Sequence, residues 1–110
     1  MRTTKSILPL EMASFNTTGL TTGFKVVNTN GFAEAPCILR ITNDSNKDVT
    51  VSYDGTNPHD YVVAGKVLQI VVPTSVKGMP AFKERTKVYV KGTGAGTGSV
   101  YLAAYYRLNV

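Results

Sequence analysis

Apolar and polar residues alternate along two segments near the middle of the chain. Leu39 and Ile41 are separated by Arg40 and Thr42, and residues 49–53 repeat the alternation with two valines and a tyrosine. Successive side chains of a β-strand point to opposite faces, so a period of two indicates strands with one buried and one solvated face. These two segments therefore set the expected fold class.

Short segments of the same kind, separated by polar turns, continue along the chain. Asn, Asp, Gly and Pro recur at the spacing that is typical of all-β sandwiches and barrels. Residues 14–23 are rich in Thr, Gly and Asn and are expected to be a connector, whereas residues 43–48 are expected to be the loop of a hairpin. The pattern predicts about eight strands, at residues 5–10, 24–27, 37–42, 49–53, 59–63, 67–72, 86–91 and 99–108.

Two of these segments carry a more specific expectation. Residues 67–72 form an apolar run broken only by Gln69, which predicts a strand buried on most sides. Residues 99–108 contain a Leu-Ala-Ala stretch that favours helix, but their three tyrosines and the glycine-rich hairpin loop before them favour strand. The sequence thus predicts an all-β fold, a single antiparallel β-sandwich that is jelly-roll-like or immunoglobulin-like. Strand pairing order cannot be read from the sequence, so a β-barrel is retained as an alternative to the sandwich.

Length and composition fit one small domain. The chain has 110 residues, of which 43% are hydrophobic and 17% charged. Residues 1–15 are expected to form an N-terminal arm or edge strand, since they contain Pro9, and residues 16–110 the sandwich domain. Cys37 is the one cysteine, so no intrachain disulfide is expected. No apolar run of transmembrane length and no signal-peptide pattern are found, so we expect no membrane contact.

Basic residues are concentrated in one short stretch, and Glu84 is the one acidic residue there. The chain carries a formal net charge of +5. A solvated loop and strand face explains such a stretch, and contact with nucleic acid or an acidic partner is the alternative. The residues concerned are Lys77, Lys83, Arg85, Lys87 and Lys91.

Candidate chemistry is limited to partial motifs. Asp44, Asn46 and Asp48 have the spacing of the first ligands of a helix-loop-helix calcium site, but Val49 and Gly55 stand where that site needs Gly and Glu. A loop rich in Asn and Asp explains these residues without a metal.

The one histidine of the chain, His59, lies near Asp54 and Asp60. A single His without a set of partners is a weak basis for a catalytic or metal site, so a turn residue bonded to the backbone is the preferred interpretation. Residues 92–98 lack the Lys-Ser/Thr pair of a phosphate-binding loop. The sequence therefore predicts a protein without catalytic residues, metal or cofactor.

The segment around the histidine has a recognisable order. A strand leads into Ser-Tyr-Asp-Gly, followed by His-Asp and then by an apolar turn that ends in Ala-Gly. This order resembles the small β-sandwich structural proteins of tailed-phage virions, over residues 37–72 and more weakly over residues 86–107. The resemblance implies a turn-forming role for the matching residues, which are Ser52, Tyr53, Asp54, Gly55, His59, Asp60, Ala64 and Gly65.

The resemblance further implies a non-enzymatic virion component, assembled in the host cytoplasm in multiple copies at the head–tail connector, in the tail or on the capsid. Its partners are then other virion proteins and further copies of itself, and residues 1–16 and 73–85 are the expected contacts. A basic small barrel that binds nucleic acid through residues 77–91 stays open. So does a carbohydrate- or surface-binding module that uses the exposed tyrosines among Tyr53, Tyr61, Tyr89 and Tyr105.

Overall fold

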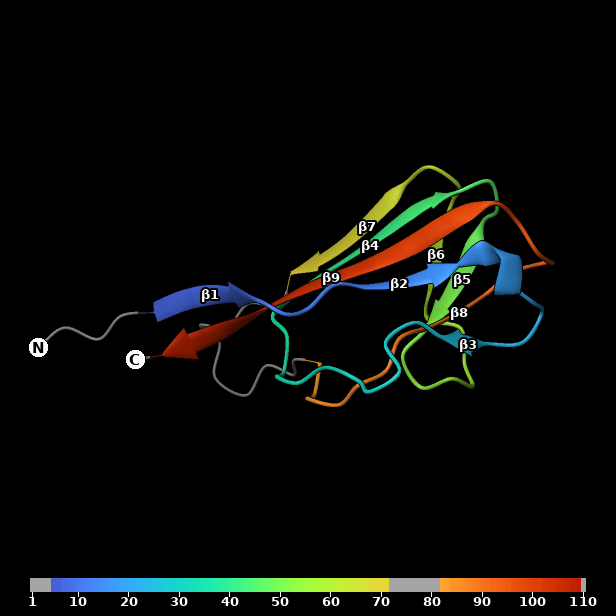
Figure 1. Cartoon of the computed structure of the whole chain (residues 1–110). Coiled ribbons are helices and arrows are strands. Elements are labelled where there is room, and N and C mark those ends of the chain that lie inside the picture. Colours follow the sequence, from blue (N-terminus) through green and yellow to red (C-terminus); the bar gives the residue numbers. More distant parts are fainter. Residues whose placement is uncertain (1–4, 72–81, 110) are drawn as a thin grey trace, which may run out of the picture.

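The computed structural model describes residues 5–71 and 82–109, which form nine β-strands and one 3₁₀ helix (Figure 1). The strands are β1 (Lys5–Pro9), β2 (Ala13–Asn16), β3 (Lys25–Val26), β4 (Ile38–Ser45), β5 (Val49–Ser52), β6 (Asp60–Val62), β7 (Val67–Val71), β8 (Tyr89–Lys91) and β9 (Gly98–Asn109), and the 3₁₀ helix η1 (Thr17–Gly19) follows β2.

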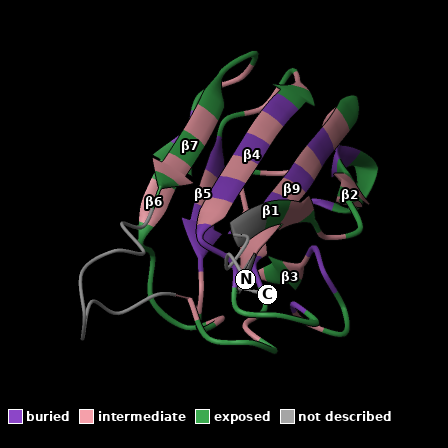
Figure 2. Cartoon of the chain, turned by 90° about the vertical axis from the view of Figure 1, so that its left-hand side faces the viewer, coloured by how far each residue is buried: buried purple, intermediate pink, exposed green. Residues whose placement is uncertain are grey.

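Two antiparallel sheets pack face to face (Figures 1 and 2). Sheet A has the order β1-β9-β4-β7, and β2 follows β1 along the same edge of β9. Sheet B has the order β3-β8-β5-β6. The expected single antiparallel β-sandwich is thereby confirmed.

The core lies between the inner faces of the two sheets. Alternate residues of each central strand are buried, as the period of two predicts. Loops add Leu20, Val27 and Phe32 to this core. The buried hydrophobic strand residues are Leu39, Ile41, Val49, Val51, Val62, Val88, Val90, Val100, Leu102 and Ala104, where Val88 directly precedes β8.

The C-terminal segment is a strand, and the helical alternative is excluded. Strand β9 is twelve residues long and pairs with β4 on one side and with β1 and β2 on the other. Its residues 100, 102 and 104 point into the core, whereas Tyr101 and Tyr105 lie on the other face and are partly exposed. A helix would have spread these apolar residues around its axis.

The expected connector at residues 14–23 was wrong in its first part. Residues 13–16 form β2, whose Ala13 and Phe15 pack against the core, and Thr17–Gly19 form the 3₁₀ helix. The polar residues of β2, Ser14 and Asn16, face solvent. Thr17 donates a hydrogen bond from its hydroxyl to the carbonyl of Gly98 at 2.8 Å. Four residues with only two apolar side chains gave too short a pattern to be recognised as a strand.

Two expected hairpins are connections between the sheets instead. Strand β4 pairs with β7 and β9 in sheet A, whereas β5 pairs with β6 and β8 in sheet B, so residues 46–48 cross from one sheet to the other. Residues 92–97 likewise lead from β8 in sheet B to β9 in sheet A. Alternation shows which face of a strand is buried but not which strand it pairs with, so these predictions were wrong.

Strand β7 is an edge strand, so the prediction that it is buried on most sides was also wrong. Val67, Gln69 and Val71 are exposed, and only Leu68 and Ile70 pack against the core. Its apolar residues are therefore distributed over both faces of the sheet, and one face is open to solvent.

Strands β1 and β9 continue beyond the sandwich as a two-stranded ribbon (Figure 1). The pairing of β4 with β9 ends at Tyr105, while β1 stays paired with β9 as far as Asn109. Between β1 and β2 the edge carries one extra residue, because Pro9 pairs with Tyr105 and Ala13 with Leu102. This irregularity is a β-bulge, which bends the edge and keeps Ala13 turned to the core.

Candidate functional site

The segment that carries the resemblance forms a turn built around the carboxylate of Asp54. Its Oδ1 accepts hydrogen bonds from the backbone N–H groups of Thr56 and Asn57, both at 2.8 Å, and from the Ser52 hydroxyl at 2.9 Å. The N–H groups of Asn57 and Thr56 hold the pKa of Asp54 well below its usual range. Gly55 follows with a φ of 81°, a left-handed conformation that favours glycine. Asp54 thus acts as the anchor of a turn.

His59 and Asp60 hold the neighbouring Tyr53 in place. The backbone N–H of Tyr53 donates to Nδ1 of His59 at 3.0 Å, and its hydroxyl donates to Oδ2 of Asp60 at 2.6 Å. The Tyr53 ring stacks on His59 and packs against Phe82, with ring centroids 5.5 and 4.9 Å away. Burial, together with Asp60, raises the pKa of Tyr53 above its usual range. With Nδ1 accepting a backbone bond, the imidazole ring serves the turn.

Ala64 and Gly65 form the turn between β6 and β7, and Asp48 holds that turn. The Asp48 carboxylate accepts from the N–H of Ala64 at 2.9 Å and from the hydroxyl of Tyr61 at 2.8 Å. The Ala64 N–H, followed by Tyr61, lowers the pKa of Asp48. Gly65 has a φ of 78°. The structure thus places Asp54, Gly55 and His59 in the connection before β6, Asp60 at the first position of β6, and Ala64 and Gly65 in the turn after it.

The described basic residues have different surroundings. Lys91 lies on the outer face of sheet B, with its ammonium group 4.6 Å from the centre of the Phe24 ring. Arg85 has a φ of 69° and lines a groove at the side of the sandwich. Lys83 and Lys87 are exposed in the segment before β8. Lys77, and residues 73–81 of the expected contact segment, lie outside the described residues.

The four tyrosines considered for a glycan-binding face are also dispersed. Tyr53 packs against the core, Tyr61 and Tyr89 belong to sheet B, and Tyr105 lies on the outer face of sheet A. Arg40 donates a hydrogen bond to the Tyr105 hydroxyl at 3.2 Å. A flat aromatic platform built from all four side chains is therefore excluded.

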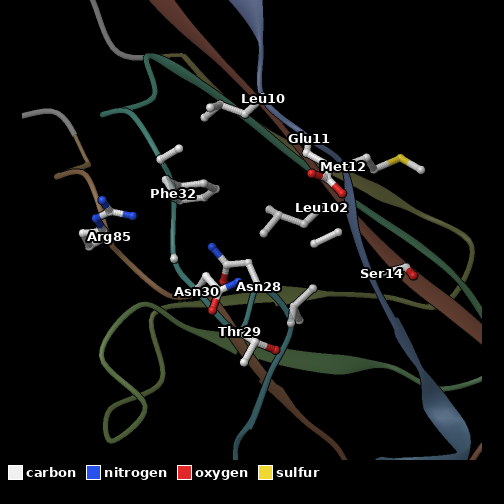
Figure 3. A pocket seen from close by; sticks show the side chains of 14 residues that line it. Leu10, Glu11, Met12, Ser14, Asn28, Thr29, Asn30, Phe32, Arg85 and Leu102 are labelled. Atoms are coloured by element: carbon white, nitrogen blue, oxygen red, sulfur yellow. The ribbon is translucent and has the colours of Figure 1, made fainter.

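A groove of about 460 Å³ opens between the β1–β2 bulge and residues 27–33 (Figure 3). Leu10, Phe32 and Leu102 form its apolar floor, and Glu11 and Arg85 belong to its lining. The sequence pattern gave no sign of it, because its lining comes from four separate segments of the chain. A glycine in the wall, Gly31, has a φ of 74° and lies directly against the backbone of Arg85.

The outer edge of the β1–β9 ribbon is the other irregular surface. Ile7 is 49% exposed there and pairs with Arg107 across the ribbon. Beyond Tyr105, no described strand pairs with the second edge of β9. Backbone N–H and C=O groups on such an edge are available to a strand from another chain.

Over residues 5–71 and 82–109, no group of three or more His, Cys, Asp or Glu side chains is arranged to hold a metal ion. Cys37 is buried, with 5% of its surface exposed. None of the helices in the same ranges is long and apolar enough to cross a membrane. Comparison of the chain with protein-family models, curated protein sequences and solved structures finds no match in any of the three.

Proposed function

We propose that this protein is a non-enzymatic structural subunit of a tailed-phage virion, which assembles in multiple copies at the head–tail connector, in the tail or on the capsid. The observation that carries the proposal is the β1–β9 ribbon, which projects from the sandwich with unpaired strand edges among the described residues (Figure 1). The turn motif around Asp54, which resembles that of tailed-phage virion proteins, supports the proposal that the assembly is a virion.

A ribbon of this kind is suited to binding a neighbour by strand addition. Residues 106–109 of β9 pair with β1 alone among the described strands, and at about 3.3 Å per residue they extend for about 13 Å. Strand addition uses backbone hydrogen bonds for affinity and alternate side chains for specificity. Leu8 and Tyr106 pair with each other on the ribbon and are partly exposed, so they offer apolar contacts for that specificity.

The test compares two lysine substitutions in the phage that encodes the chain. Ile7→Lys places a second positive charge opposite Arg107 in the ribbon, where like charges destabilise the pair. Met12→Lys is the matched control, because Met12 is 60% exposed and lies outside the ribbon. The readout is the copy number of the protein per purified particle, measured by quantitative mass spectrometry.

We expect the protein in wild-type particles at a fixed copy number, a loss of at least tenfold for Ile7→Lys, and little change for Met12→Lys. Thermal unfolding followed by circular dichroism shows whether each variant is folded. Absence of the protein from wild-type particles overturns the virion assignment. Normal incorporation of Ile7→Lys overturns the role of the ribbon.

A further inference from the structure

Most of the large exposed hydrophobic residues of the described chain lie along one edge of the sandwich. Six such side chains are exposed among the described residues, and four of the six lie between residues 61 and 71. These four belong to β6, β7 and the turn between them, which form one lateral edge of the sandwich (Figure 2). Val67 and Val71 lie on the outer face of sheet A and Tyr61 on that of sheet B, so β7 contributes the two apolar side chains that share one face. The four are Tyr61, Val63, Val67 and Val71.

Strand β7 is the sheet edge that lacks the usual protection against pairing. Natural edges are blocked by proline, charge, a bulge or short length. The opposite edge of sheet A carries Pro9 and the bulge, and in sheet B the edge strands are two and three residues long, with Lys25 in β3 and Asp60 in β6. Strand β7 has five residues, Val-Leu-Gln-Ile-Val, without charge or proline, and no described strand lies on its outer side.

We propose that two copies of this chain pair through their β7 strands, antiparallel and about a two-fold axis at Gln69. The sequence of β7 is nearly palindromic about that residue. The pairing sets Val67 opposite Val71 of the second copy, Leu68 opposite Ile70, and Gln69 opposite Gln69. Apolar residues thus meet apolar residues on both faces, and the two A sheets become one continuous sheet.

Charge does not oppose this contact, although each chain has a net charge of +5. Two basic residues lie near the proposed contact: Lys66 directly precedes β7, and Arg40 pairs with Gln69 across β4 and β7. Across the dimer the two Arg40 residues are three strand spacings, or about 14 Å, apart. In this register the two Lys66 residues lie at opposite ends of the paired strands, six residue spacings or about 20 Å apart. Both distances exceed the Debye length of about 8 Å at physiological salt, so these repulsions are screened.

The inference rests on the proposed assembly function and names one of its contacts. In a register centred on Gln69, residue 69 of one copy lies directly opposite residue 69 of the other copy. The variants Gln69→Lys and Gln69→Glu each place two like charges opposite one another, whereas a mixture of the two places Lys opposite Glu. Ser14→Lys is the control, since Ser14 is exposed on the opposite edge of sheet A.

The measurement is the molar mass of the full-length protein by sedimentation and light scattering, over a range of concentrations at physiological salt. We expect the wild type and Ser14→Lys to form dimers reversibly, each Gln69 variant to dissociate at least tenfold more readily, and the equimolar mixture to recover dimers. A wild type that stays monomeric, a Gln69→Lys variant that dimerises normally, or a mixture that fails to recover overturns the inference.

Failure of this inference and failure of the proposed function give different results. If Gln69→Lys leaves both dimerisation and incorporation into particles unchanged while Ile7→Lys abolishes incorporation, the β7 contact is wrong and the virion role stands. If the mixture experiment succeeds and the protein is absent from particles, the β7 contact stands and the virion role is wrong.

Discussion

Replacing Asn43 with alanine is expected to destabilise the sandwich by about 3 kcal/mol. Asn43 is fully buried on the inner face of β4. Its Nδ2 donates to the carbonyl oxygens of Lys47 at 2.7 Å and Val62 at 3.0 Å, and its Oδ1 accepts from the Ser45 hydroxyl at 2.6 Å. The amide therefore ties β4 in sheet A to β6 in sheet B and to the connection between β4 and β5.

The expected magnitude follows from three hydrogen bonds of the Asn43 amide that are lost, although the Lys47 carbonyl keeps the Ser45 hydroxyl within reach as a donor at 3.1 Å. A typical intramolecular hydrogen bond contributes about 0.5–1.5 kcal/mol, so three of them contribute on the order of 3 kcal/mol. This is a large fraction of the 5–15 kcal/mol by which a typical domain is stable. Asn43→Asp is expected to be more damaging, because a carboxylate cannot donate and faces the same carbonyl oxygens.

Urea unfolding followed by circular dichroism and tyrosine fluorescence measures this loss, since the chain has no tryptophan. Asn30→Ala is the control, because Asn30 is an exposed asparagine and its replacement should change the stability by less than about 0.5 kcal/mol. An Asn43→Ala protein within about 1 kcal/mol of the wild type would refute the assignment of Asn43 as a link between the sheets.

Two further predictions concern the turns. The pKa of Asp54 is lower in the folded protein than its unfolded value of about 4, so its contribution to stability is complete above about pH 4 and is lost as the pH falls further. The substitution Asp54→Asn should therefore flatten the dependence of stability on pH between about 5 and 2, measured by urea unfolding at each pH. Gly31→Ala should lower the melting temperature more than Gly65→Ala, because both glycines have a positive φ but only at Gly31 does the added carbon meet the backbone of a neighbouring segment; equal losses would show that φ alone matters.

The strands themselves were largely visible in the sequence, because a half-buried strand must alternate apolar and polar residues. Strand β4 shows the extent of this information: Leu39 and Ile41 were expected to be buried, and they are. Asn43 lies on the same face of β4 as Leu39 and Ile41, and a polar residue at such a core-facing position indicates a buried hydrogen-bonding group. This signal was missed because residues 43–48 were expected to be a loop.

Partner choice was not visible, since pairing depends on contacts between distant segments. Strands β4 and β5 are neighbours in sequence but belong to different sheets. The apolar run of β7 looked like a buried strand, yet Val67 and Val71 are 55% and 60% exposed. The proposed contact surfaces were not visible for the same reason, because a strand is an edge strand only when no other strand pairs with its outer side.

The two proposed contacts use different strands of sheet A and differ in symmetry. Pairing through β7 is isologous, so it closes after two copies. Strand addition at the β1–β9 ribbon, if it engages a different surface of the neighbour, is heterologous and continues from copy to copy. A subunit with both contacts builds an assembly of dimers, whereas the ribbon alone builds a ring or a filament. Loss of the β7 contact is therefore expected to change the symmetry of the assembly, and loss of the ribbon contact is expected to stop growth at the dimer.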